Sequence, residues 1–172
     1  NADFHQVTND FNDYAEIGLS GDGKTIVTMK GEASSSLWRY SPANSQMTQM
    51  TNDGRNIFGL NGLVQSSDGL IVFTSKEGKE SKLWRSDKDG KNPAAITAEA
   101  GSSFTPATSP DGRSIIFVKQ VDKVSRIWRM NADGTEPVQL TNDDPSVVDF
   151  NPQITPDGKR PMISCDFTAW IA

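Results

Sequence analysis

Four aspartates recur along the chain at near-regular spacing, and carboxylates are side chains that bind divalent cations and perform acid–base chemistry. They are Asp22, Asp68, Asp111 and Asp157, at intervals of 46, 43 and 46 positions. Each precedes a glycine, and Asp-Gly pairs favour tight turns, because aspartate bonds its own backbone and glycine accepts positive φ. We interpret these aspartates as turn residues and structural markers, since a functional site usually breaks the symmetry of a repeat.

The other reactive side chains assemble no catalytic group. His5 is the only histidine and Cys165 the only cysteine, which excludes a multi-histidine zinc site and an intrachain disulfide. A Ser-His-Asp triad would require His5, which falls on an end strand. Among the 22 Asp and Glu residues, no pair is singled out for glycoside chemistry. We predict no catalytic residue, no metal ligand and no cofactor, and leave a cation bound in a central channel as an open alternative.

The composition suits a chain of many short strands. It has 172 residues, with 14 Gly and 9 Pro to punctuate turns. The net charge of −5 argues against a nucleic-acid groove, which needs a basic stripe. No apolar run approaches the length of a membrane-spanning helix, so no membrane span is expected.

Two further markers follow each aspartate in a fixed order. An apolar residue precedes a tryptophan, and arginine follows it in three copies: Trp38, Trp84, Trp128 and, without the arginine, Trp170. An apolar residue and threonine then close the unit: Val7-Thr8, Met50-Thr51, Ile96-Thr97 and Leu140-Thr141. Units of four short strands, repeating every 40 to 50 residues or so, are typical of β-propeller blades. We expect the tryptophans to pack between blades and the arginines to contact the neighbouring blade or lie exposed.

Within each unit, strand a precedes the Asp-Gly turn, strand b follows it, strand c carries the tryptophan and strand d ends at the threonine. The sequence therefore predicts an all-β chain forming a single β-propeller domain over residues 1–172, built from four tandem four-stranded blades. The blades are expected at 9–52, 53–97, 98–141, and 142–172 completed by 1–8.

The last blade is expected to be completed by the N-terminal strand. Asn1-Ala2-Asp3 resembles Asn131-Ala132-Asp133, and no strand a, b or c precedes it, whereas the last repeat runs only to its tryptophan. Three assemblies are compatible with a last blade that an N-terminal strand completes. One chain closes as a four-bladed ring, two chains exchange end strands in an eight-bladed homodimeric ring, or the chain is a fragment of a larger propeller.

The segments SPDGRSIIFVK, IWRMNADGT and PVQLTND resemble the TolB-like propeller repeat, a WD-like repeat of bacterial proteins. The resemblance covers nearly the whole chain and is specific for fold rather than for function. It implies relatives such as periplasmic TolB, which binds partner proteins, and propellers attached to peptidases and kinases. Two copies depart from the pattern, with Ser67 in place of proline and Pro161 where other copies have isoleucine, so the strand at Pro161 should begin late or be distorted.

Function is expected in the loops, because the d–a and b–c loops share one face of a propeller. The candidate partner-binding residues there are mainly acidic: Asp10, Asp13, Asp53, Arg55, Asp143, Asp144 and Asp149. We predict a non-catalytic scaffold that binds a protein or peptide, in a periplasmic or extracellular setting. The alternatives are a propeller hydrolase or lyase using channel carboxylates with a cation, and an accessory domain of a peptidase or kinase.

Overall fold

The computed structural model describes residues 13–31, 35–51, 58–144, 146–165 and 168–171. Every secondary-structure element in these ranges is a β-strand, and the sheets are antiparallel, which confirms the predicted all-β class. Among these residues there is no helix that could cross a membrane. The chain divides into two compact units, residues 1–34 and 35–172.

The smaller unit contains a hairpin of β1 (Asp13–Leu19) and β2 (Ile26–Gly31). The Asp-Gly turn at Asp22 joins the two strands, and Gly23 takes a positive φ of 68°. The register shifts between Ala15 and Ile17, which marks a β-bulge in the first strand.

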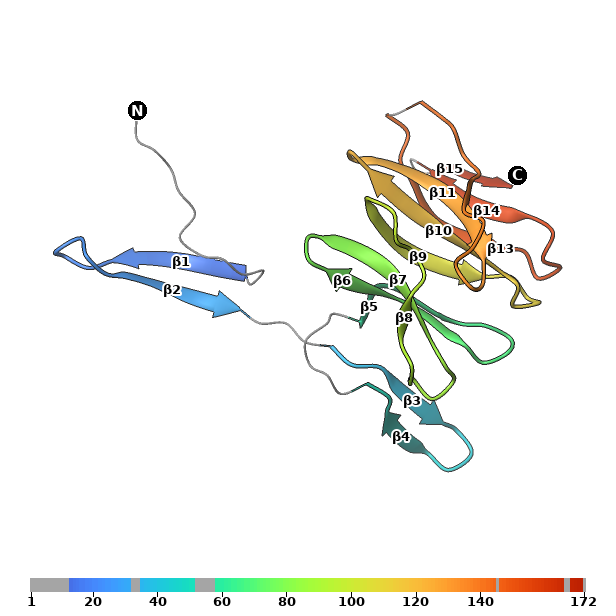
Figure 1. The fold of residues 1–172 in the computed structure, drawn as a ribbon, viewed down its shortest axis with the longest axis horizontal. Coiled ribbons are helices and arrows are strands. Elements are labelled where there is room, and N and C mark those ends of the chain that lie inside the picture. Colours follow the sequence, from blue (N-terminus) through green and yellow to red (C-terminus); the bar gives the residue numbers. More distant parts are fainter. Residues whose placement is uncertain (1–12, 32–34, 52–57, 145, 166–167, 172) are drawn as a thin grey trace. The chain divides into compact units, whose positions relative to one another are not determined.

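The larger unit holds two complete four-stranded meanders (Figure 1). The first contains β5 (Phe58–Gln65), β6 (Ile71–Glu77), β7 (Glu80–Ser86) and β8 (Ala94–Ala95). The second contains β9 (Ser102–Thr108), β10 (Ser114–Val121), β11 (Val124–Asn131) and β12 (Val138–Gln139). In both, the strands are hydrogen-bonded in chain order, as the a–b–c–d pattern of the repeat predicts.

Within the described residues, the first and last repeats form sheets of fewer than four strands. β3 (Trp38–Ser41) pairs only with β4 (Gln46–Gln49), and β13 (Asp149–Ile154), β14 (Pro161–Cys165) and β15 (Thr168–Ile171) form a three-stranded sheet. Pro161 is the first residue of β14, a place where a strand tolerates proline. The N-terminal strand expected at residues 4–8 lies outside the described residues, so a closed four-bladed ring and the single-domain division stay predictions.

Three apolar clusters join neighbouring sheets of the larger unit. Val72 and Leu83 of the first meander pack with Ile115, Phe117 and Met130 of the second. Val118 and Ile127 pack with Ile163 of β14, and Leu37 packs with Ile71 and Phe73. Burial of apolar area is the dominant favourable term in folding, so these clusters hold the sheets together.

Two of the tryptophans lie beside these clusters. Trp128 packs against the cluster of Val72 and Leu83, and Trp84 packs against the cluster of Leu37. Trp38 is instead 52% exposed. Trp84 and Trp128 therefore pack against clusters that join two neighbouring sheets, in line with the predicted packing between blades.

The arginine after each tryptophan contacts a c–d turn in two of three cases. Arg39 bonds the Asp89 carboxylate at 3.1 Å, and Arg85 donates to the Ala132 carbonyl at 3.2 Å. Both partners belong to the next sheet along the chain. Arg129 instead donates to Ser114 of its own sheet, at 3.0 Å.

Candidate functional site

Loops and turns at one end of the two meanders form the surface that the sequence pointed to, here called the loop face. It comprises residues 77–80, 96–101, 121–124 and 140–148, with residue 145 outside the described ranges. Residues 96–101 contact the turns at 77–80 and 121–124. The Gly101 N–H donates to Glu80 Oε1 at 2.9 Å, and a Cβ on Gly101 would lie 2.4 Å from the Gln120 carbonyl oxygen.

Lys82, in β7, holds the loop that follows β8. Its ammonium group donates to the Glu99 carbonyl at 2.5 Å and the Gly101 carbonyl at 3.2 Å, and pairs with Glu80 at 2.8 Å. Lys82 is only 7% exposed. Because a buried charge is costly unless it is paired and hydrogen-bonded, these contacts fix the backbone of the loop.

Arg126 has the equivalent role in the second meander, where it lies in β11 just ahead of Trp128. Its guanidinium donates to the carbonyls of Asp143 at 2.6 Å, Asp144 at 3.0 Å and Val147 at 2.9 Å. A guanidinium offers five N–H donors in a fixed fork, so one side chain can hold several carbonyls at once. The loop between β12 and β13 is thereby tied to β11.

Asp149 lies beneath that loop rather than on its surface. It is 1% exposed, and its Oδ2 accepts a 2.5 Å hydrogen bond from the Thr141 hydroxyl. The same oxygen is 3.9 Å from Arg126 NH1, and Oδ1 has no hydrogen-bond partner among the described residues. Asp149 thus supports the loop from inside and does not present its carboxylate to a partner.

Asp143 and Asp144 are exposed on the loop face. The carboxylate of Asp144 accepts from the Ser146 hydroxyl at 2.6 Å and the Ser146 N–H at 2.9 Å, which together lower its pKa below the ordinary value. Of the other candidates, Asp13 is described only as backbone of β1. The rest lie outside the described residues: Asp10, Asp53 and Arg55.

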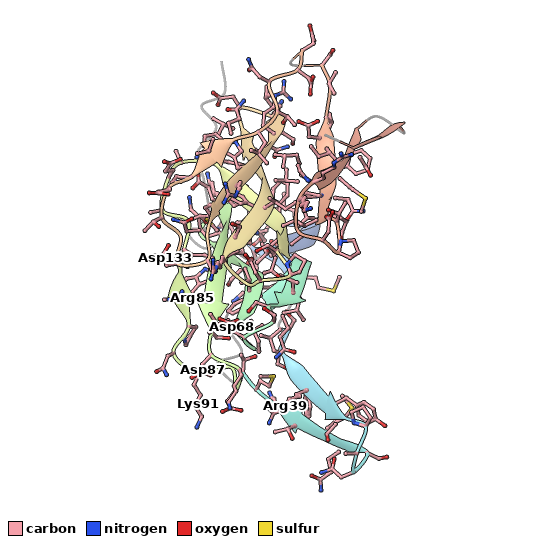
Figure 2. The ribbon with its side chains drawn as sticks, turned by 90° about the vertical axis from the view of Figure 1, so that its right-hand side faces the viewer. Arg39, Asp68, Arg85, Asp87, Lys91 and Asp133 are labelled. Atoms are coloured by element: carbon pink, nitrogen blue, oxygen red, sulfur yellow. The ribbon has the colours of Figure 1, made fainter. Side chains whose placement is uncertain are left out.

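The aspartates of the a–b turns are engaged by their own turns. In the turn after β9, Asp111 Oδ1 accepts from the Ser109 hydroxyl at 2.6 Å and the Arg113 N–H at 3.1 Å, and Gly112 takes a φ of 72°. The same hydroxyl bond recurs at Asp22, Asp68 and Asp157. At Asp68 the Ser66 hydroxyl lowers the pKa most, and the charge of Arg85 contributes (Figure 2). No group of three His, Cys, Asp or Glu side chains within the described ranges could hold a metal ion.

Sequence reasoning missed the role of Lys82 and Arg126 as buried cations that hold the loops. The repeat pattern puts Lys82 in an exposed b–c loop, and lysine is usually at the surface. The available signal was the basic residue two positions before Trp84 and Trp128, inside an apolar strand.

No family model matches the chain, and no curated protein matches its sequence. Solved structures do match. A TolB-type protein from Agrobacterium tumefaciens has a TM-score of 0.70 at 21% identity, over 94% of this chain and 58% of that one. TolB from Acinetobacter baumannii has a TM-score of 0.63 at 23% identity, over 79% and 34%. A manganese-bound oligogalacturonate lyase has a TM-score of 0.65 at 15% identity, over 96% and 51%.

The chain spans 58% or less of each of these proteins. They include a lyase as well as TolB proteins, so the similarity shows the fold and does not show the activity. On this evidence the chain has the β-propeller fold seen in TolB.

Proposed function

We propose that the chain is a non-catalytic propeller scaffold that binds a protein or peptide through the loop face. The supporting observation is that buried Lys82 and Arg126 fix the backbone of two loops by their carbonyls. Glu99, Asp143 and Asp144 remain at the surface of those loops. Loops that are already ordered lose less conformational entropy when a partner binds.

The chemistry of the loop face indicates the kind of partner. Acidic side chains of both loops stand beside exposed apolar residues, namely Val121 at 44% and Val148 at 42%. Such a surface complements a segment that carries lysine or arginine next to apolar side chains. Rim charges act mainly on association rate and salt dependence, so binding should weaken as ionic strength rises.

Selection from a random peptide library against the full chain tests this proposal. We expect selected peptides to be rich in Lys, Arg and apolar residues. We expect Asp143→Lys to weaken their binding about fivefold or more, because it reverses a charge that the partner faces. Glu136→Lys is the matched control, since Glu136 is exposed on the c–d turn outside the loop face. Peptides that bind both variants as well as the parent chain would overturn the proposal.

A further inference from the structure

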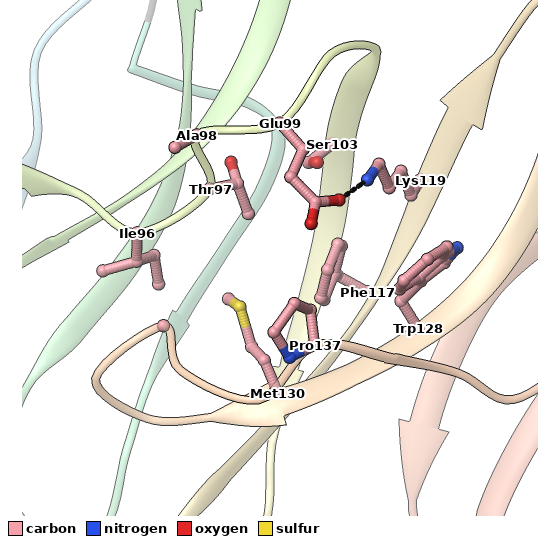
Figure 3. A pocket seen from close by; sticks show the side chains of 11 residues that line it. Ile96, Thr97, Ala98, Glu99, Ser103, Phe117, Lys119, Trp128, Met130 and Pro137 are labelled. Atoms are coloured by element: carbon pink, nitrogen blue, oxygen red, sulfur yellow. Dashed lines mark hydrogen bonds and ion pairs between the residues drawn. The ribbon is translucent and has the colours of Figure 1, made fainter.

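A cavity of about 220 Å³ lies between the loop that follows β8 and the sheet that contains β10 and β11 (Figure 3). Its walls are mainly apolar and are formed by Ile96, Phe117, Trp128, Met130 and Pro137. Phe117 and Met130 are each only 1% exposed, so one wall of the cavity consists of buried apolar side chains. An apolar cavity of roughly 150 Å³ is enough to bind benzene, so this one can hold a phenyl or branched aliphatic group.

One cation is fixed at the edge of the cavity. The Lys119 ammonium lies 4.5 Å from the centroid of the Trp128 ring and pairs with the Glu99 carboxylate (Figure 3). Lys119 is 8% exposed and sits in the buried middle of β10. The face of the ring attracts the ammonium group, and the low exposure strengthens the attraction of that group for an anion.

The partner anion is far less constrained than the cation. The Glu99 side chain is 60% exposed, against 9% for that of Lys119. The loop does not depend on the Glu99 carboxylate, because Lys82 holds it through the backbone carbonyls of Glu99 and Gly101. Glu99 can therefore rotate into solvent and leave a buried ammonium beside an apolar cavity.

We propose that this cavity binds a carboxylate carried on an apolar group. The apolar group fills the space beside Phe117 and Met130, and the carboxylate replaces that of Glu99 on Lys119. Two sources share this chemistry, the C-terminal residue of a peptide and a free organic acid. The cavity shares residues 96–99 with the loop face, but the inference does not require the loop face to bind a partner.

Binding of three probes to the full chain is measured by calorimetry. The NMR signal of the Trp128 indole N–H, assigned by comparison with the Trp128→Phe variant, shows whether a probe binds at this cavity. The probes are 3-phenylpropionate, a short peptide ending in phenylalanine with a free carboxylate, and the same peptide amidated. We expect at least one acid to bind and the amidated peptide to bind about tenfold more weakly or worse, since a hydrogen bond between charged groups is lost. Binding of the peptide acid alone identifies a peptide ligand, and binding of phenylpropionate identifies a free acid.

Two substitutions should change the affinity for these probes in opposite directions. We expect Glu99→Ala to tighten binding several-fold, because it removes the competing carboxylate. We expect Lys119→Met to weaken it about tenfold or more, because it removes the cation. Lys119→Arg keeps the charge and should retain binding, which separates loss of the cation from loss of folding. The inference fails if neither acid binds, if the amidated peptide binds as well as its acid, or if Glu99→Ala weakens binding.

Discussion

Thr97 and Leu83 are joined across the last two strands of their sheet: the buried N–H of Leu83 donates to the Thr97 hydroxyl at 3.0 Å. Two other repeats contain the same bond: Leu37 with Thr51 at 2.9 Å, and Ile127 with Thr141 at 3.0 Å. The donor is the residue just before the tryptophan each time. In these three repeats the closing threonine is therefore required by a backbone N–H that cannot reach water.

Replacement of Thr97 by valine keeps the shape of the side chain and removes the acceptor. We expect a loss of about 1–3 kcal/mol in the free energy of unfolding, because the Leu83 N–H is left buried and unpaired. Thr141→Val should cost more, since the Thr141 hydroxyl also donates to Asp149. Urea unfolding measures both, with Thr97→Ser as the control that keeps the hydroxyl. An unchanged midpoint for Thr97→Val would contradict this account.

The sequence markers that predicted the fold are those that depend on interactions between residues close together in sequence. Asp111 and Gly112 encode a turn within a few residues of sequence. The tryptophan lies in strand c and the threonine follows strand d closely. Completion of a blade depends instead on contacts between distant segments. Trp38 carries the same local pattern as Trp84 but is 52% exposed, and nothing near it in sequence encodes what would cover it.

The candidate site was predicted less well for the same reason. The sequence placed Lys82 and Asp149 at the surface, because lysine and aspartate are rarely buried. Their burial depends on groups far along the chain: Glu99 is 17 positions from Lys82, and Arg126 lies beside Asp149 only once β11 and β13 have packed. Composition and spacing do not report such pairs.

Removal of Lys82 or Arg126, the buried cations that hold the loop carbonyls, should destabilise the chain unequally. Arg126→Met leaves three loop carbonyls without their donor and Asp149 without a nearby cation, and we expect a loss of about 3–5 kcal/mol. Lys82→Met frees two carbonyls and a carboxylate that is already 43% exposed, so its loss should be nearer 1–3 kcal/mol. Urea unfolding gives the order, and limited proteolysis should cut at 140–148 in the first variant and 96–101 in the second. Equal losses, or cleavage elsewhere, would count against the assigned contacts.

Acid should weaken the turns that contain Asp-Gly. The Ser109 hydroxyl, and then the Arg113 N–H, hold the pKa of Asp111 below its ordinary value of 3.8. A folded-state pKa below the unfolded value adds stability that is present above the unfolded pKa and is lost as pH falls through the folded pKa. Asp22, Asp68 and Asp157 are shifted in the same direction. The stability advantage of the parent chain over Asp111→Asn should therefore shrink between about pH 5 and pH 2 in urea titrations. A constant difference would show that the carboxylate charge contributes nothing.

The first strands of the two meanders, β5 and β9, meet at a bulge, and substitution of one glycine tests that contact. The register of β5 shifts between Phe58 and Leu63, and Gly62 within the shift takes a φ of 130°. A Cβ there would lie 2.5 Å from Cδ of Pro106 in β9. Gly62→Ala must therefore strain the backbone and push the strands apart, at a cost of roughly 1–3 kcal/mol or more.

Gly78→Ala is the matched control for this close approach. Gly78 also has a positive φ, 63°, but a Cβ there meets nothing within 4 Å. Gly78→Ala should cost only the strain of a left-handed backbone conformation, about 1 kcal/mol. The difference between the two variants in urea unfolding thus isolates the packing of β5 against β9. If Gly62→Ala and Gly78→Ala lose the same free energy of unfolding, the two sheets are not held together at this bulge.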